Sequence, residues 1–319
     1  MSASLIAYLL SSHRKMGVFN RTAYGPEICA LVAAVLNGTI GVLTRTGFDQ
    51  GATPAMIAFW KCFGAFVVVS LLCACRHDLG TQTVRLARRW PQFACLAFLG
   101  IFSLYHFETT AFSHASIPLV SFLTYAAGGA TLALSGRFLG ETTTRRKTAA
   151  FLAIVLGVGV MGLFESGIDG STAGIALALA GGCGYALFIF LAKWFRIGSG
   201  LPQLVWLFGF RSAFLSIPLM REGFAMPSGA AWMTLCALVL LPTIGGFYLT
   251  TRAVAGGQAS KVQIIETSDP LFATLFGFAL FGDRLSQEGM LGAGFIAIGL
   301  VIAVWDRPGD GATSARYDV

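Results

Sequence analysis

Two carboxylates lie near the start of an otherwise apolar stretch, residues 261–283. Glu266 and Asp269 are three residues apart, a spacing that places them on one face of a helix. Pro270 follows at once and removes a backbone donor, which frees a carbonyl near residue 266. A carboxylate at membrane depth costs about 2.5 kcal/mol or more, so such groups face a bundle interior or a wet path. The stretch therefore predicts an irregular, polar site inside a membrane protein.

Two basic residues lie inside other apolar stretches and are candidates to bind substrate carboxylates. Lys61, in IAFWKCFGAF, and Arg211, in LFGFRSAFLS, occupy related positions in the two halves of the chain. The alternative is that each pairs with an internal acid or reaches the interface for structural reasons. Glu266 and Asp269 have two functional interpretations, which are to hold a substrate ammonium group or to carry a coupling proton. Their structural alternative is an ion pair with Lys61, Arg211 or Lys261.

Other polar and aromatic residues are secondary candidates. His106 and Glu108, in SLYHFETTAF, are candidates for a proton relay, or are simply polar residues near an outer mouth. An aromatic wall can hold an apolar part of a substrate, although packing alone also explains each ring. The aromatic residues expected near the site are Trp60, Tyr105, Tyr125, Tyr185 and Tyr248.

The composition places these residues in a membrane protein. The chain of 319 residues is 55% hydrophobic and 12% charged, with a mean hydropathy of +0.73, whereas soluble domains are about 25% charged. The net charge of +7 does not indicate nucleic-acid binding, because the basic residues lie in short loops between apolar runs. The seven cysteines form no CxxC and none has a histidine at metal-ligand spacing, so we expect no metal and no cofactor.

Apolar runs of about 20 residues predict ten membrane spans and an all-α integral membrane fold. The 22 Lys and Arg residues alternate between connections, 17 on one side and 3 on the other, with 2 inside spans. This asymmetry predicts that the N- and C-termini are cytoplasmic. Residues 1–26 and 306–319 are predicted cytoplasmic tails. The predicted spans are 27–47, 54–75, 91–111, 115–137, 147–164, 173–194, 202–220, 230–251, 262–282 and 287–305.

The chain also repeats itself. The segment FLGE at 138–141 matches LFGD at 280–283, and the same offset aligns Gly157 with Gly299 and Gly128 with Pro270. We call this shift of 142 residues, from position 138 to position 280, the repeat offset. Each half holds five predicted spans, and an odd number inverts the second half relative to the first. The predicted repeats are residues 27–165 and 173–305. Inverted repeats are typical of secondary transporters, with a site near the midplane between the halves.

These stretches resemble a known family. The doubled order of a broken span, a Leu/Phe-Gly-Glu/Asp segment and a Gly-rich span is similar to EamA-type proteins of the drug/metabolite transporter superfamily. The resemblance covers about residues 27–305. It implies an inner-membrane transporter, usually an exporter of amino acids or other small metabolites. The chain departs from the family pattern at Lys61, where arginine is common, and at Asn37, where tryptophan is common.

The leading hypothesis is a non-enzymatic exporter of a small zwitterionic, amino-acid-like metabolite, such as an amino acid or an opine-type metallophore. Protons are a candidate coupling ion, and the protein is expected to be a monomer or a homodimer in the bilayer. One alternative is a nucleotide-sugar or organic-phosphate antiporter, although Glu266 and Asp269 would repel phosphates. A remote alternative is an intramembrane enzyme, for which the chain lacks an HExxH or GxSxG motif.

Overall fold

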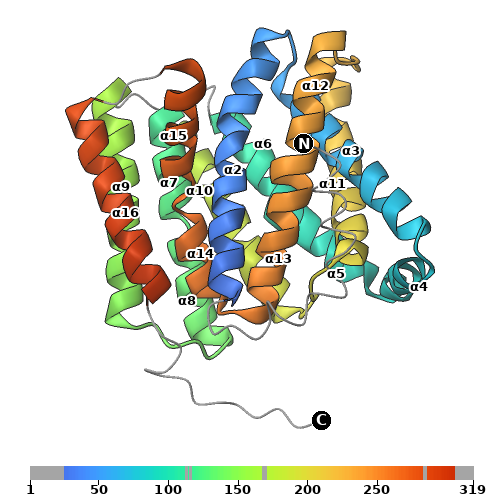
Figure 1. The fold of residues 1–319 in the computed structure, drawn as a ribbon, viewed down its shortest axis with the longest axis horizontal. Helices are drawn as coiled ribbons and strands as arrows, with labels where there is room; N and C mark the ends of the chain where they lie inside the picture. Colours follow the sequence, from blue (N-terminus) through green and yellow to red (C-terminus); the bar gives the residue numbers. More distant parts are fainter. Residues whose placement is uncertain (1–24, 112–113, 115–116, 167–170, 283–285, 306–319) are drawn as a thin grey trace.

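Ten helical spans form the molecule in this computed structural model, which describes residues 25–111, 114, 117–166, 171–282 and 286–305 (Figure 1). Most of both predicted tails therefore lies outside the described residues. Six spans are single helices or continuous helical runs long and apolar enough to cross a membrane by themselves. The first half contains α2 (Gly25–Asp49), α3 (Pro54–Ala74), α5–η2–α6 (Trp90–Ala111), α7–α8 (Ile117–Phe138) and α9 (Arg145–Ser166). The second contains α10 (Thr172–Trp194), α11 (Leu201–Glu222), α12–η3–α13 (Gly229–Gly256), α14–α15 (Ala259–Phe281) and α16 (Gln287–Trp305).

Each half carries the same two irregularities, which confirms the fold expected from the repeat. The third span of each half contains a π-helical segment, η2 (Leu96–Phe102) or η3 (Val239–Gly246). Such segments are rare and are often found at functional sites. The fourth span of each half is broken, between α7 (Ile117–Ala126) and α8 (Gly129–Phe138), and between α14 (Ala259–Glu266) and α15 (Asp269–Phe281). The predicted opening of the helix before Pro270 is therefore present.

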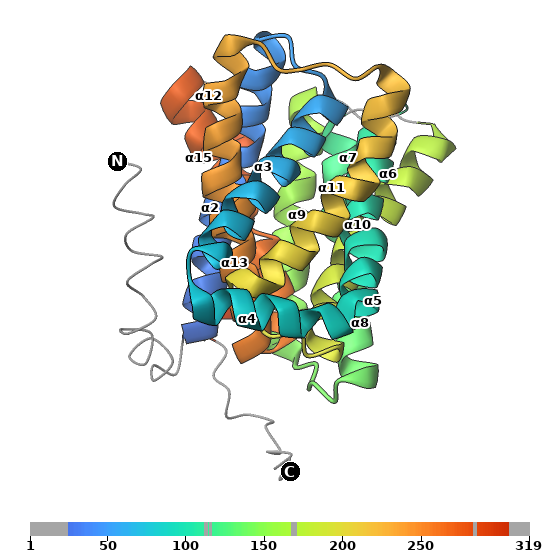
Figure 2. The same cartoon turned by 90° about the vertical axis from the view of Figure 1, so that its right-hand side faces the viewer.

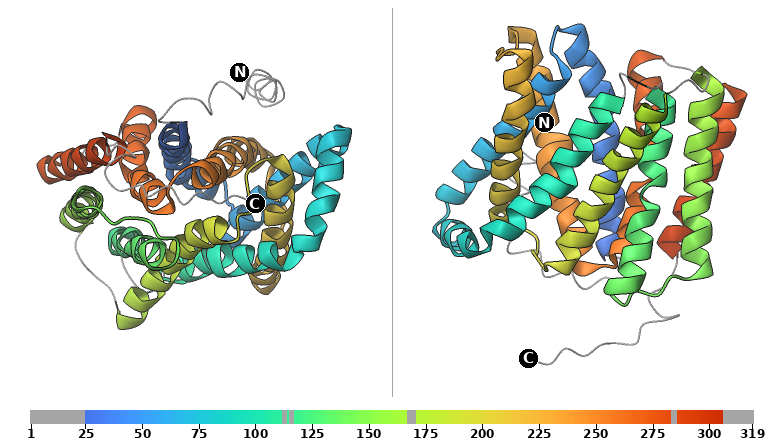
Figure 3. Two further views of the ribbon diagram at one scale, coloured as in Figure 1. Left: turned by 90° about the horizontal axis from the view of Figure 1, so that it is seen from below. Right: turned by 180° about the vertical axis from the view of Figure 1, so that it is seen from behind.

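The two halves interlock rather than lying side by side (Figures 1 and 3). The first span of each half packs against the third and fourth spans of the other: α2 lies against α12–α15, and α10 lies against η2 and α6–α8. The second spans, α3 and α11, pack together, and so do the fifth spans, α9 and α16. This exchange places the broken spans and π segments of both halves around a common centre.

Paired glycines show the two-fold relation at atomic detail in the contact between α9 and α16. A Cβ at Gly157 would lie 2.5 Å from the carbonyl oxygen of Gly292, and one at Gly299 would lie 2.7 Å from that of Ala150. At the repeat offset, Gly299 corresponds to Gly157 and Gly292 corresponds to Ala150. The repeat therefore makes the same backbone contact twice, and only small residues permit it.

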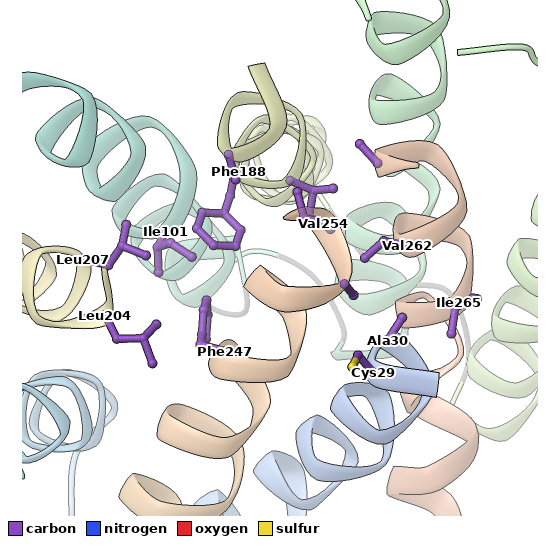
Figure 4. Close-up of a cluster of buried hydrophobic side chains, with 14 of the residues drawn as sticks. Cys29, Ala30, Ile101, Phe188, Leu204, Leu207, Phe247, Val254, Val262 and Ile265 are labelled. Atoms are coloured by element: carbon purple, nitrogen blue, oxygen red, sulfur yellow. The ribbon is translucent and has the colours of Figure 1, made fainter. Parts of the chain in front are cut away.

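A short surface helix, α4 (His77–Leu86), crosses one end of the bundle (Figure 2). We call this end the basic face, because the connections 75–89, 139–144, 195–200 and 257–258 and their flanking residues carry most of the arginines of the described chain. Between the faces, apolar side chains fill the space between helices. Figure 4 shows part of this core, in which Phe188, Phe247 and Leu204 come from α10, α13 and α11.

Candidate functional site

Two buried cations rest on aromatic rings at the centre of the bundle. The ammonium of Lys61, on α3, lies 4.2 Å from the centroid of the Tyr105 ring on α6. The guanidinium carbon of Arg211, on α11, lies 4.3 Å from the Phe247 ring and 5.5 Å from the Tyr105 ring. Both cations therefore approach Tyr105, and we call them the cationic pair. Cation–π contacts of this kind are worth about 2 kcal/mol when desolvated.

Arg211 is the largest fully buried side chain of the described residues, with 1% of its surface exposed. None of its three guanidinium nitrogens has a hydrogen-bond partner among those residues. A guanidinium offers five donors in a planar fork that matches a carboxylate. Ring contacts satisfy its charge in part but none of its donors, so Arg211 can still bind an anion.

Glu266 is held by hydroxyl groups and not by a cation. One carboxylate oxygen accepts a 2.5 Å hydrogen bond from Tyr185 on α10, and the other accepts a 2.7 Å hydrogen bond from Thr250 on α13. The residue is 2% exposed and ends α14, immediately before the break at Thr267 and Ser268. The break is what turns the backbone here, so Glu266 and Asp269 belong to different helices and do not share one continuous helical face.

Asp269 and Glu108 complete a group of three acids that we call the carboxyl cluster, together with Glu266. Asp269 lies in the first turn of α15, where the helix dipole favours an anion, and interacts with the hydroxyl of Tyr125 on α7. Its Oδ1 atom has no hydrogen-bond partner within the described chain. Glu108, on α6, packs against Gly181 of α10 and lies within electrostatic reach of Asp269.

The cationic pair and the carboxyl cluster are neighbours without forming an ion pair between described residues. Lys61 is the cation that acts on Glu108, but no ion pair within 4.0 Å joins them. The expected structural alternative for Glu266, an ion pair with Lys261, is wrong, because Lys261 lies 2.9 Å from Glu27 at the start of α2. The sequence analysis missed Glu27, since a glutamate in the first turn of a helix is usually a surface residue.

Three expected site residues lie elsewhere or contribute differently. Trp60 does not contact the cationic pair's rings: it donates a hydrogen bond to the carbonyl of Ala225 and packs against Trp232, since adjacent helical residues point about 100° apart. His106 stacks on Phe102 at 5.4 Å, in a row of aromatic rings. Tyr248 is half-buried on α13 and packs against the main core.

The basic face is closed by contacts that converge on the connection between α13 and α14 and on the start of α14. The Glu141 carboxylate accepts hydrogen bonds from the backbone nitrogens of residues 259 and 260, and Lys193 donates to the carbonyl of Gly257 at 2.7 Å. Lys147 donates to Gln258, and Lys261 pairs with Glu27. We call this set, centred on residues 257–261, the latch. It ties α2, α8, α9 and α10 to one short segment.

Thr250, which donates to the Glu266 carboxylate, and Thr124, whose hydroxyl donates to the carbonyl of Ala178, were not predicted. A threonine in an apolar helix is common and usually bonds its own backbone, so neither residue carries a signal alone. The repeat supplies one, because the repeat offset aligns Glu108 with Thr250 and Thr124 with Glu266.

Comparisons with known proteins agree with this architecture. The model of the "EamA-like transporter family" matches twice, at residues 26–163 and 172–305. An uncharacterized transporter of Archaeoglobus fulgidus is 26% identical over 89% of this chain and 98% of its own length. The uncharacterized transporter YwfM of Bacillus subtilis is 24% identical over 86% of this chain and 92% of its own.

Solved structures share the fold, among them a crystal structure with a TM-score of 0.74 and 17% identity over 89% of this chain and 99% of the other. At this identity the match concerns the fold alone. The family model covers most of the chain, and both relatives align over nearly their whole length. The chain is therefore a multi-pass membrane transporter that belongs to the EamA-like transporter family of the drug/metabolite transporter superfamily.

Proposed function

We propose that this transporter exports a small zwitterionic, amino-acid-like metabolite across the inner membrane. The observation that carries the proposal is a central site of both charge signs whose members hold rings and hydroxyl groups rather than one another. A substrate with both charge signs satisfies both halves of such a site. Its carboxylate meets Lys61 and Arg211, and its ammonium group meets the carboxyl cluster.

A substrate with more than one carboxylate fits best, because two cations approach the single ring of Tyr105. This class includes dicarboxylic amino acids and larger amino-acid derivatives of the opine type. Organic phosphates also bind cations, but three acids lie beside the cationic pair and would repel a phosphate dianion. Uptake or exchange in liposomes with amino acids and with sugar phosphates as competitors separates the two classes.

The basic face is the cytoplasmic face in this proposal, which places the described ends of the chain, Gly25 and Trp305, on the cytoplasmic side. Transport then requires that the latch opens, because it closes the cytoplasmic end while Glu108 and Asp269 remain partly exposed. Alternating access in inverted-repeat transporters is largely a rocking of one repeat against the other around a fixed site. The present arrangement corresponds to the state closed to the cytoplasm.

Glu266 is the first candidate to carry a coupling proton and Asp269 the second. Glu266 has no cation partner in the described chain, and its two hydroxyl donors stabilise the ionised form only while the surrounding helices stay closed. The test is Glu266→Gln in proteoliposomes. We expect proton-driven accumulation to be lost while substrate counterflow, which needs no net proton movement, continues. A variant that still responds to an imposed pH gradient would remove Glu266 from the coupling role.

A further inference from the structure

The two halves carry twin carboxyl–threonine pairs in which the carboxyl has changed sides. In the first half Glu108, on the third span, and Thr124, on the fourth, lie against the neighbouring glycines 181 and 182 of α10, and the Thr124 hydroxyl donates to the carbonyl of Ala178 at 3.4 Å. In the second half Thr250, on the third span, donates a 2.7 Å hydrogen bond to Glu266, on the fourth. At the repeat offset, Glu108 corresponds to Thr250 and Thr124 corresponds to Glu266. The same two positions therefore hold an acid and a threonine in each half, in exchanged order, and among the described residues the direct hydrogen bond forms in the second half.

The rings that support the cations follow the same relation. The repeat offset also aligns Tyr105 with Phe247, and each ring follows the π segment of its half. Lys61 lies 4.2 Å from the first ring and Arg211 lies 4.3 Å from the second. Each half thus contributes one cation on one ring, and one acid at a position where the other half has a threonine, so these parts of the site are related by an approximate two-fold axis.

The two pairs lie at different depths and in different surroundings. Glu108 is three residues from the end of α6 at Ala111, on the side away from the basic face, and it is partly exposed. Thr250 lies on α13, which ends at the basic face, and the pair it forms with Glu266 is sealed, with 1% and 2% exposed. The latch lies between this second pair and the basic face.

We infer that Glu108 and Glu266 exchange environments during the transport cycle. When the two inverted halves exchange conformations, each pair takes the surroundings that the other has now. Opening the basic face then exposes Glu266 to the cytoplasm and seals Glu108 against Thr124. Glu108 is therefore a second binding carboxyl of the site, which receives a substrate ammonium group on the outer side as Glu266 does on the inner side. This inference rests on the proposed two-sided transport but not on proton coupling.

Thiol labelling tests the exchange without a substrate or a pH gradient. The seven native cysteines are replaced by alanine, and the background is accepted only if it elutes as a single species and transports. Glu108→Cys and Glu266→Cys are introduced singly and together, and membrane-impermeant reagents are added from one side at a time. Thr172→Cys and Thr143→Cys, which are exposed on opposite faces, control the sidedness of the reagent.

We expect Glu108→Cys to react only from the outside and Glu266→Cys only from the cytoplasmic side. In the double variant, a bulky label at position 108 holds the outer side open and should slow labelling at position 266 at least tenfold. The inference is overturned if position 266 reacts from the outside, if it reacts from neither side, or if the label at position 108 does not change the labelling rate at position 266.

A functional variant supplies a second, independent measurement. Glu266→Thr alone should lose transport, whereas Glu266→Thr combined with Thr250→Glu rebuilds the second pair in the arrangement of the first and should recover at least a tenth of the native rate. Thr251→Glu replaces Thr250→Glu in the control, because Thr251 is equally buried but bonds its own backbone. If the combination with Thr250→Glu and the combination with Thr251→Glu transport equally poorly while both proteins remain folded, the twin-pair relation is contradicted. If Glu266→Gln keeps its response to a pH gradient while reciprocal labelling is intact, this inference stands and only the proposed proton-coupling role of Glu266 is withdrawn.

Discussion

Replacing Arg211 by methionine should make the substrate-free protein more stable, which is the opposite of what most core substitutions do. The guanidinium is 1% exposed and its nitrogens have no hydrogen-bond partner in the described chain. Burying an ion costs several kcal/mol after relaxation, and its ring contacts return about 2 kcal/mol. Methionine is shorter but apolar and of similar volume, so Arg211→Met should stabilise the protein, by about 1–4 kcal/mol if the gain matches that of replacing a buried ion pair with apolar side chains.

Lys147 offers a matched control, because it is also a buried cation but one with partners. It is 3% exposed and donates hydrogen bonds to the carbonyl of Thr142 at 2.8 Å and to Gln258 at 2.5 Å. Lys147→Met leaves these acceptors without a donor, which costs about 1–3 kcal/mol for each. The two substitutions remove the same charge at similar burial, yet they should change stability with opposite signs.

The assay is the melting temperature of purified protein in one detergent, without ligand and then with a panel of amino acids. A ligand at 100 times its Kd adds about 2.7 kcal/mol, so a binding amino acid should raise the melting temperature of the native protein and of Lys147→Met. Arg211→Met should melt higher than the native protein and should lose the ligand-induced rise. A fall in melting temperature like that of Lys147→Met would show that the guanidinium is a structural group, and the carboxylate role would be withdrawn.

Three further predictions concern the latch, the helix packing and the orientation. Glu27→Gln removes the carboxylate partner of Lys261, and breaking such a buried pair costs about 3–5 kcal/mol. Thiol reagents added from the cytoplasm should then label a cysteine in the central site faster. An unchanged labelling rate contradicts the role of the latch. Gly299→Val places a branched side chain against the backbone of α9 and should lower the yield of folded protein, whereas the same change at exposed Gly294 is the control. Thr143→Cys should react only from the cytoplasm, and reaction from outside would invert the proposed topology.

The sequence was sufficient for the architecture because the bilayer constrains it strongly. Apolar runs of spanning length and alternating basic connections left few choices for the number and direction of spans. The expected spans agree with the observed ones within a few residues, apart from the eighth, which extends from Gly229 to Gly256 rather than ending at residue 251. The broken ninth span followed from Pro270. The break in the fourth span was harder to foresee, because Gly128 indicates a break only when it is aligned with Pro270.

The site was foreseen only in part, because membrane depth indicates which residues are functional but not what they touch. Lys61, Arg211, Glu266 and Asp269 stood out as charges in apolar helices, and the structure brings them to one centre. Their contacts depend on helix rotation, and each residue of an interruption changes that rotation by about 100°. Trp60 shows the consequence, since its neighbour Lys61 faces the centre while the indole faces Trp232.

The arrangement of charges explains why such a site can both bind and release. A direct ion pair between Arg211 and Glu266 would leave neither charged group without a partner, and a substrate would have to break the pair before binding. Here rings hold the cations and hydroxyl groups hold the acid, so the opposite charges stay apart at short range. Each support is worth only about 1–3 kcal/mol, which a zwitterion can replace with its own charged groups. If the two halves exchange environments as inferred above, the two-fold relation supplies a similar set of supports in each facing state, and the proposed substrate is not trapped in either one.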